Sequence, residues 1–187
     1  MSKDYIDIYF AETKNIIDSI NREDILKVSA VISDLRNTAG RLFILGIGGS
    51  AANASHAVND FRKIARIEAY AASDNVSELT AWTNDSGFEY IFIEWLKVSK
   101  LTENDVLLVL SVGGGTKTVS QNLVLAMRYA KEKNARVVSI VSRDGGEARK
   151  ISDACILIPV IDQKRVTPHA EGFQAVLLHL IVNNIST

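Results

Sequence analysis

Apolar residues in the N-terminal part of the chain recur at helical spacing. From Tyr5 to about Ile20, and again from Ile25 to Leu35, they stand three or four positions apart, which is the period of one face of an α-helix. Asp24 or one of its neighbours can cap the second stretch with a side-chain oxygen. The pattern predicts a pair of helices before the rest of the fold.

Further along the chain the pattern changes to short apolar runs. Each run is followed by a polar or glycine-rich turn and, in most cases, by a stretch with helical periodicity. Such alternation is typical of a parallel sheet with helices on both faces. The sequence therefore predicts an α/β fold, a three-layer αβα sandwich around five parallel strands. These strands should cover residues 42–47, 69–73, 106–112, 137–142 and 155–160.

Composition narrows the possible functions. The 187 residues carry 21 lysines and arginines against 22 aspartates and glutamates, so no global field attracts nucleic acid or an anionic membrane. With two prolines and no low-complexity tract, we expect one domain over residues 1–187. The chain starts without a secretory signal and has no apolar run long enough to span a membrane. These features favour a soluble, cytoplasmic protein.

Three side chains with possible chemistry have a more ordinary explanation. The one cysteine, Cys155, lies in the apolar run ACILIPV, where a small buried hydrophobe is a more frequent role than a reactive thiol. Trp82 and Trp95 fall on helical stretches and are expected to pack rather than to stack on a sugar. The segment SRDGG (142–146) is expected to be a turn.

Two glycine-rich loops follow predicted strands. GGS (48–50) comes after the first strand, and GGGT (113–116) comes after the third, before a helix that should begin near Lys117. Glycine lets backbone N–H groups approach an anion, and a helix N-terminus attracts it, so both loops are candidate phosphate cradles that need no arginine. Neither loop has a dinucleotide fingerprint or a P-loop lysine, which argues against a nucleotide cofactor. The alternative is that the glycines of these two loops only allow tight packing of the backbone.

The first loop leads into a histidine and an aspartate four positions apart. His56 and Asp60 share one helix face and could hold a metal or move a proton. Taken alone, the pair has simpler explanations: the histidine can pack on the next turn, and Asp60 can pair with Arg62 or Lys63. His179, in the apolar run AVLLHLIV, would likewise be a core or interface residue.

Taken together and in order, the motifs resemble those of the phosphoheptose isomerases, which are enzymes with a sugar isomerase (SIS) domain. The matching segments are GIGGSAANASH with Asp60 after it, NDSGFEYIF (84–92), SVGGGTKT (111–118), SRDGG (142–146), and TPHAE with a histidine eight positions later. The resemblance covers nearly the whole chain. It implies the flavodoxin-like SIS fold and conversion of sedoheptulose 7-phosphate to glycero-manno-heptose 7-phosphate, for lipopolysaccharide, capsule or another glycoconjugate.

The resemblance also implies an oligomer. Family members are tetramers with sites built between subunits. We therefore expect the helices of residues 1–38 to serve in oligomerisation and residues 39–187 to form the αβα core.

The resemblance assigns the substrate phosphate to the second loop. Ser111 and Thr116 match hydroxyl residues of the family loop, and Gly113 replaces its middle serine, so one side-chain donor is lost. Gly114 and Gly115 could compensate with backbone N–H groups. The other positions implied to face substrate are Gly49, Ser50, Asn53, Asp85, Thr167 and Glu171.

The resemblance implies that a carboxylate and a histidine carry out the proton transfers of the isomerisation. Moving a proton between C1 and C2 through an enediol needs a base, and an acid or a metal must offset charge on oxygen. The family's glutamate is Asp60 here, one methylene shorter, which displaces the carboxylate by roughly 1 Å. The histidine for ring opening and oxygen protonation is His179. We expect the two to converge across a subunit boundary, around a single cavity whose far wall is the serine- and glycine-lined phosphate site.

Some family members bind zinc, and the matching ligands are His56, Asp60, Glu171 and His179. Glu171 replaces a glutamine, and His169 replaces an arginine. Two imidazoles and two carboxylates suit zinc or another divalent ion. On one continuous helix, Glu171 and His179 would be about 12 Å apart, too far for one ion. Glu171 should therefore lie at or before the helix start, or the ligands must meet in a different way.

Two alternatives to an isomerase stay open. The lost loop serine and the altered carboxylate suit a non-catalytic SIS protein that binds a replication initiator or another protein, although the retained His56, Asp60 and His179 argue against it. The other alternative is a phosphosugar sensor or an SIS enzyme of another reaction type, such as an etherase or an amino-sugar isomerase. Those chains are usually longer.

Overall fold

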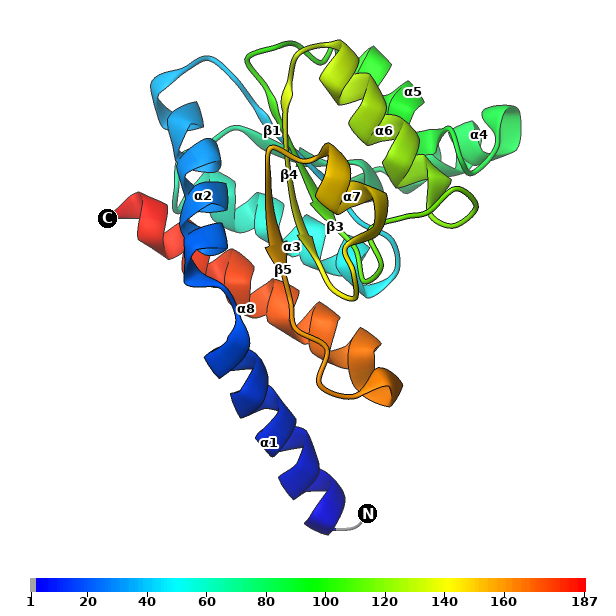
Figure 1. Ribbon diagram of the computed structural model, residues 1–187. Coiled ribbons are helices and arrows are strands. Elements are labelled where there is room, and N and C mark those ends of the chain that lie inside the picture. Colours follow the sequence, from blue (N-terminus) through cyan, green and yellow to red (C-terminus); the bar gives the residue numbers. More distant parts are fainter. Residues whose placement is uncertain (1–2) are drawn as a thin grey trace.

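The computed structural model describes residues 3–187 (Figure 1). Five strands form one parallel sheet in the order β2-β1-β3-β4-β5, between two layers of helices. The predicted three-layer αβα sandwich is confirmed. The strands are β1 (Leu42–Leu45), β2 (Ala69–Ala71), β3 (Val106–Leu110), β4 (Arg136–Val141) and β5 (Ala154–Leu157).

Helices cover both faces of the sheet, and one helix projects beyond it (Figure 1). One face packs against α2 (Arg22–Ser33), α3 (Gly49–Lys63) and α8 (Val166–Ser186). The other face packs against α4 (Val76–Ser86), α5 (Ile91–Val98), α6 (Gln121–Glu132) and α7 (Gly146–Ile151). The projecting helix is α1 (Lys3–Ser19), and short 3-10 helices cover Asp34–Asn37 (η1), Ala72–Asp74 (η2) and Gln163–Arg165 (η3). Between residues 3 and 187, no helix is both long and apolar enough to cross a membrane.

The central strands are apolar on both faces, which is why both faces carry helices. In β3, Val106, Leu108 and Leu110 pack on the side of α2, α3 and α8. Leu107 and Val109, which alternate with them, pack on the opposite side. All five side chains are fully buried. A strand buried on both faces gives a continuous apolar run in the sequence, and this run made the strands predictable.

Element boundaries differ from the sequence-based expectation, because local hydrogen bonds end or delay the elements. The predicted strands run a few residues too far at their carboxyl ends. The helix expected near Lys117 begins at Gln121. The hydroxyl of Thr116 first closes a separate turn by accepting hydrogen bonds from the amides of residues 118 and 119, and Ser120 then adopts left-handed backbone (φ 53°). The cap of α2 is Asn21, and Asp24 lies inside that helix.

The order of strands reverses at β1, which pairs with β2 on one side and β3 on the other. In open parallel sheets, ligands bind at such a switch point, beyond the carboxyl ends of the strands. Both glycine-rich loops leave the sheet there, one after β1 and one after β3. The fold therefore places the two candidate phosphate cradles side by side.

Helices α3 and α8 lie side by side and run in the same direction (Figure 1). Asn53 on α3 contacts Glu171 and Gln174 on α8, and Asp60 further along α3 contacts His179 further along α8. Because later residues of α3 contact later residues of α8, the two helices are parallel. The polar faces of the two helices therefore share one groove.

A buried ion cluster joins α1 to the start of α8. Arg165 donates hydrogen bonds to both carboxylate oxygens of Glu12, at 2.6 and 2.8 Å. His169 Nε2 lies 2.9 Å from the same carboxylate, and its ring stacks on Tyr9 with centroids 4.3 Å apart. The hydrogen bonds from Arg165 are the main reason why the pKa of Glu12 falls to about 2.

The position of α1 should depend on the charge of Glu12. Because the folded pKa of about 2 lies below the ordinary value of 4.5, the stabilisation is complete above about pH 4.5 and disappears as the pH falls toward 2. Glu12→Gln should therefore unfold at lower urea concentration than the unchanged protein at pH 7. The gap between the two should close as the pH is lowered from 4.5 toward 2.

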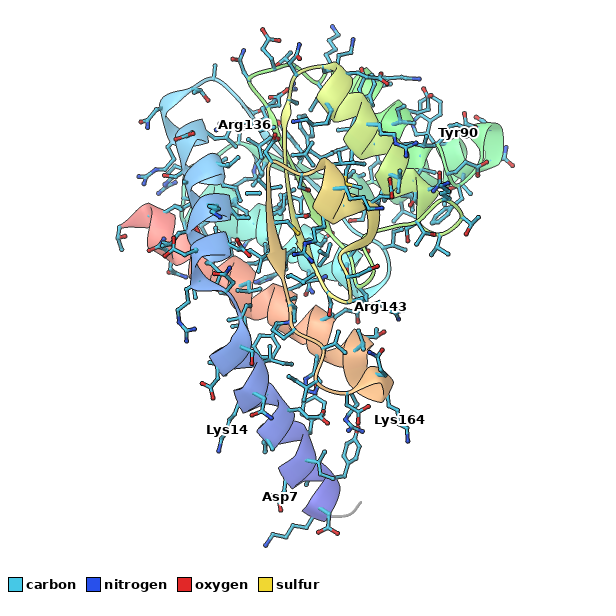
Figure 2. All side chains as sticks on the ribbon, in the orientation of Figure 1. Asp7, Lys14, Tyr90, Arg136, Arg143 and Lys164 are labelled. Carbon is cyan, nitrogen blue, oxygen red and sulfur yellow. The ribbon has the colours of Figure 1, made fainter. Side chains whose placement is uncertain are left out.

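The matched control is Asp7→Asn, on the exposed side of the same helix (Figure 2). It should unfold at nearly the urea concentration of the unchanged protein throughout this pH range. A gap between Glu12→Gln and the unchanged protein that stays constant from pH 7 to pH 3 would contradict the role given to the carboxylate.

Candidate active site

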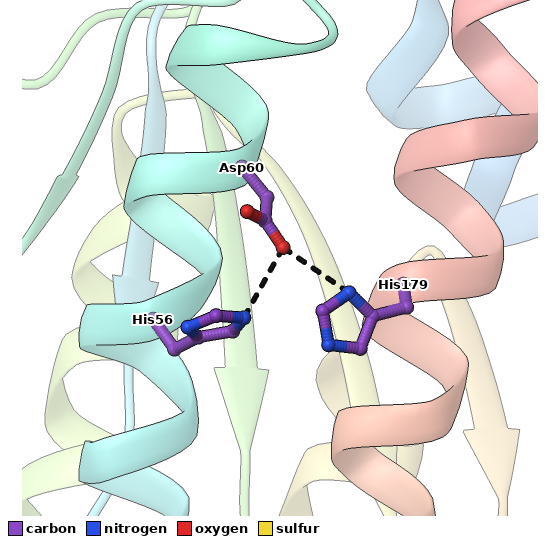
Figure 3. Close-up of side chains that lie close together, drawn as sticks. All are labelled: His56, Asp60 and His179. Carbon is purple, nitrogen blue, oxygen red and sulfur yellow. Dashed lines mark ion pairs between the residues drawn. The ribbon is translucent and has the colours of Figure 1, made fainter.

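Asp60 lies between two imidazoles in the groove of α3 and α8 (Figure 3). Its Oδ2 is 3.3 Å from His56 Nε2 and 3.2 Å from His179 Nδ1. Its Oδ1 accepts a hydrogen bond of 3.0 Å from Asn59 Nδ2. The Asp60 side chain is 12% exposed, whereas those of His56 and His179 are 56% and 53% exposed. The carboxylate therefore forms the floor of the site and the two imidazoles form its rim.

Helix geometry explains how these three residues meet. His56 and Asp60 are four residues apart on α3, so they share one face of that helix. The parallel course of α8 then brings His179 to the same place, within one chain. The expectation that Asp60 and His179 meet across a subunit boundary is therefore wrong. Asp60 also does not pair with Arg62, whose guanidinium donates to the carbonyl of Ala69.

The His56–Asp60–His179 cluster has the composition of a metal site. One nitrogen from each histidine and one carboxylate oxygen all lie within 4.8 Å of one another. Two imidazoles and a carboxylate form the three-ligand set of some catalytic zinc sites, which keep a fourth position open for water or substrate. The donor set therefore fits a divalent ion.

Glu171 does not join this cluster. Helix α8 is continuous from Val166 to Ser186, so Glu171 lies within it rather than at or before its start, as a shared ion would require. Its carboxylate lies over the first turn of α3, where a Cβ on Gly49 would be 2.4 Å from Oε2. Of the four expected metal ligands, the structure brings three together.

Ser50 and Asn53 were expected to face substrate, but their side chains donate hydrogen bonds to residues of α8. The buried Ser50 hydroxyl donates a 2.9 Å hydrogen bond to Gln174 Oε1. Asn53 Nδ2 donates to the same oxygen at 3.2 Å and to the carbonyl of Glu171 at 2.9 Å. Sequence reasoning missed Gln174, although a lone amide in an apolar helical run is a signal for a buried polar contact.

The second glycine loop lines a cavity of about 430 Å³ at the carboxyl edge of the sheet. It contains most of the residues expected to hold phosphate. The lining residues are Ile47, Ser111, Val112, Gly113, Gly115, Thr116, Val119, Ser120, Arg143, Asp144 and Thr167. Gly114, also expected there, donates its N–H to the hydroxyl of Ser111 at 3.1 Å. A Cβ on Gly114 would stand 2.0 Å from the carbonyl oxygen of Gly145, so only glycine fits this close approach.

The two charged residues of this cavity were not foreseen. Arg143 and Asp144 belong to the segment SRDGG, and its predicted turn is confirmed by left-handed backbone at Gly145 and Gly146. That these two residues line a cavity follows only from the packing of the turn against the loop after β3. Asp85, by contrast, is exposed on α4, accepts a hydrogen bond from Asn84 and does not line the cavity.

Cys155, Trp82 and Trp95 were expected to pack in the interior, and all three pack against one apolar cluster. Burial raises the pKa of the Cys155 thiol, which makes it a poor nucleophile. Trp95 meets Phe43 edge to face, with centroids 5.3 Å apart, and Trp82 packs against the same apolar cluster.

Comparison with known proteins identifies close relatives in sequence and in structure. The SIS domain family model matches residues 8–142. A phosphoheptose isomerase from Helicobacter pylori is 30% identical over 174 residues, which cover 90% of this chain and 85% of that protein. A lincomycin biosynthesis protein from Streptomyces lincolnensis is 32% identical over 81% of this chain, which spans 58% of that protein. The structure of a phosphoheptose isomerase from Neisseria gonorrhoeae superposes with a TM-score of 0.84 at 25% identity, covering 98% of this chain and 97% of that one.

The geometry of the cluster predicts how mutations change metal affinity. His179→Asn removes one of three ligands and should weaken zinc binding by more than about 100-fold, measured by titration calorimetry. Glu171→Gln should leave zinc affinity unchanged, because this carboxylate lies outside the cluster. Comparable losses in the two variants would put Glu171 among the ligands.

Proposed function

This chain belongs to the phosphoheptose isomerases, a family of SIS domain proteins, and on that premise we propose that it interconverts a ketose phosphate and an aldose phosphate. We propose sedoheptulose 7-phosphate and glycero-manno-heptose 7-phosphate as the substrate pair, because the sequence motifs imply it and the chain is similar to proteins named phosphoheptose isomerase. The observation that carries the proposal is the carboxylate of Asp60 held between two accessible imidazoles. A protein that only bound a partner would have no use for this arrangement, which argues against a non-catalytic role.

The substrate phosphate would bind in the cavity beside residues 113–116. The hydroxyls of Ser111, Thr116 and Thr167 line this cavity. Helix α6 starts beside it without a side-chain cap, and the amides of Gln121 and Asn122 in its first turn have no acceptor within the described part of the chain, so they keep capacity for an anion. Gly49, Ser50, Asn53, Asp85 and Glu171 stay predictions as further substrate contacts.

Asp60 and His179 would divide the proton transfers. Asp60 would take a proton from C1 of the open-chain ketose and return it to C2 of the enediol. His179 would give a proton to the oxygen on C2 and accept the proton that leaves the oxygen on C1, after serving in ring opening. A general acid and a general base positioned in this way each contribute about 10²- to 10⁴-fold in rate.

His56, Asp60 and His179 would hold a divalent ion through one atom each, and we propose that the ion is zinc. The second carboxylate oxygen of Asp60 and the second ring nitrogen of His179 would then remain for the proton transfers. Bound there, the ion would polarise the substrate carbonyl and offset charge that develops on oxygen. The carboxylate of Asp60 is more deeply buried than the two imidazoles, and the hydrogen bond from Asn59 orients it. The two rings contact each other edge to face, with centroids 5.1 Å apart, so the reacting carbons would have to approach Asp60 from beside the rings and not between them.

The length of α8 supports sites shared between subunits. Thr167, at the phosphate cavity, and His179 are twelve residues apart on one helix, or about 18 Å along its axis. A seven-carbon sugar phosphate is shorter than this distance. We therefore propose a tetramer in which the cluster of one subunit completes the phosphate cavity of another.

The N-terminal helices offer a surface for this assembly. We propose that residues 1–38 serve in oligomerisation and that residues 39–187 form the core of a single SIS domain working in the cytoplasm. The support is the number of exposed apolar side chains on α1, which are Tyr5, Ile6, Ile8, Phe10 and Ile17.

Turnover of sedoheptulose 7-phosphate tests the proposed function. Incubated with this substrate and zinc in D₂O, the protein should form the aldose phosphate with deuterium at the exchanged carbon, which NMR detects. Asp60→Asn and His179→Asn should each lower kcat by about 10²- to 10⁴-fold.

The control is Glu103→Gln, an exposed substitution in the loop before β3 that should keep full activity. Failure of the unchanged protein to turn over this or any other ketose phosphate, with and without zinc, would reject the isomerase and favour a binding protein.

A further inference from the structure

Arg143 lies in the tight turn between β4 and α7, at the carboxyl edge of the sheet (Figure 2). The turn closes where the amide of Gly145 donates a 3.0 Å hydrogen bond to the carbonyl of Ser142. Within it, Arg143 has left-handed backbone with φ 56°. This conformation is unfavourable for a residue with a Cβ, and glycine would adopt it more easily. Such strain at a cavity is a reason to ask what the side chain does.

The turn is fastened to the glycine loop by backbone hydrogen bonds. The amide of Ser142 donates to the carbonyl of Val112 at 3.0 Å, and the amide of Ala148 donates to the carbonyl of Gly114 at 2.9 Å. The position of Arg143 relative to the loop after β3 is therefore fixed by main-chain atoms and not by its own side chain.

The guanidinium of Arg143 is left without a protein partner. Within residues 3–187 it has no hydrogen bond, ion pair or ring contact. The neighbouring Asp144 is not its partner, because that carboxylate accepts a 3.1 Å hydrogen bond from the amide of Gly146. An exposed, unpaired guanidinium can turn toward a ligand without breaking an existing contact.

The side chain of Arg143 lies where the cavity has lost a donor. Its Cδ is 3.8 Å from the position that a Cβ on Gly113 would take. Gly113 is the residue that replaces the middle serine of the family loop. Of the described residues that line this cavity, Arg143 is the only cation. The hydroxyls of Ser111 and Thr116 supply hydrogen bonds but no charge to balance a phosphate dianion.

We propose that Arg143 binds the phosphate of the substrate and supplies the positive charge that the hydroxyls of the cavity lack. The proposal rests on the proposed function, because it names a further residue of the same site and takes the ligand to be a phosphate monoester. A guanidinium forms paired hydrogen bonds with phosphate, and hydrogen bonds to charged groups are stronger than those between neutral groups.

Two measurements test the role of Arg143. The first is the affinity for inorganic phosphate, by titration calorimetry. The second is the separation of KM from kcat with sedoheptulose 7-phosphate. Arg143→Ala should weaken phosphate binding and raise KM by about 10- to 100-fold, and kcat should stay within about twofold of the original value, since Arg143 lies away from the reacting carbons. Arg143→Lys should recover part of the loss, because it restores the charge but not the paired geometry.

Arg66 supplies a matched control. It is also an exposed arginine with left-handed backbone (φ 59°), but it lies outside the phosphate cavity. Arg143→Gly and Arg66→Gly should both remove backbone strain, so both proteins should melt at or above the temperature of the unchanged protein. Only the Arg143 variant should lose phosphate affinity. This pair separates binding from folding if the alanine variant folds poorly.

A serine at position 113 tests whether a hydroxyl beside Arg143 can take over part of its role. A Cβ on Gly113 has no neighbour closer than 3.8 Å and that neighbour is a flexible side chain, so serine fits without a clash. Gly113→Ser should restore phosphate affinity in the Arg143→Ala background and should gain less in the unchanged protein. Such non-additivity is expected of two residues that serve one ligand.

The outcomes separate this proposal from the proposed function. If Arg143→Ala binds inorganic phosphate as tightly as the unchanged protein, or changes kcat and not KM, the role of Arg143 is wrong even if the protein is an isomerase. If no sugar phosphate is turned over, the proposed function fails, and the phosphate titrations alone decide whether Arg143 binds phosphate.

Discussion

The parallel packing of α3 against α8 is the contact on which the candidate site depends. The buried amide of Gln174 accepts hydrogen bonds from Ser50 and Asn53 near the start of α3, which sets the register of the two helices. With that register fixed, Asp60 and His179 face each other further along the groove. A shift of one helix by a single residue would move His179 about 1.5 Å along the groove and rotate it away by about 100°. A buried polar contact thus positions the reactive groups, while the apolar core supplies the stability.

The phosphate cavity depends on a different constraint, the close approach of two backbones. The loop after β3 and the turn after β4 approach so closely that Gly114 lies directly against the carbonyl of Gly145. The amide and the carbonyl of Gly114 both form hydrogen bonds within the protein, so the amide is not available to a ligand. The remaining donors are hydroxyls, the amides of Gly113 and Gly115, the free amides at the start of α6 and the guanidinium of Arg143. The protein thus combines a rigid backbone cradle with one adaptable cation.

The sequence was sufficient for the fold and for part of the site. Strands that are apolar on both faces predicted a sheet covered by helices on each side. The four-residue spacing of His56 and Asp60 predicted that they share one face of a helix. The sequence was not sufficient where position depends on neighbours distant along the chain. The placement of Glu171 over Gly49 follows from the packing register of α8, and the placement of Arg143 in the cavity follows from the turn against the β3 loop. The late start of α6 depends on the hydroxyl of one threonine, which a propensity argument does not weigh.

The central claim is that the Asp60 cluster and the phosphate cavity are two ends of one substrate site. A crystal structure of the protein soaked with zinc and a non-isomerisable heptose phosphate tests it most directly. The account predicts an ion held by His56, Asp60 and His179 of one chain, with the first carbons of the sugar beside it. The phosphate should lie on residues 113–116 of a neighbouring chain. A phosphate bound away from these residues, or a sugar whose carbons lie far from every Asp60, would contradict the account.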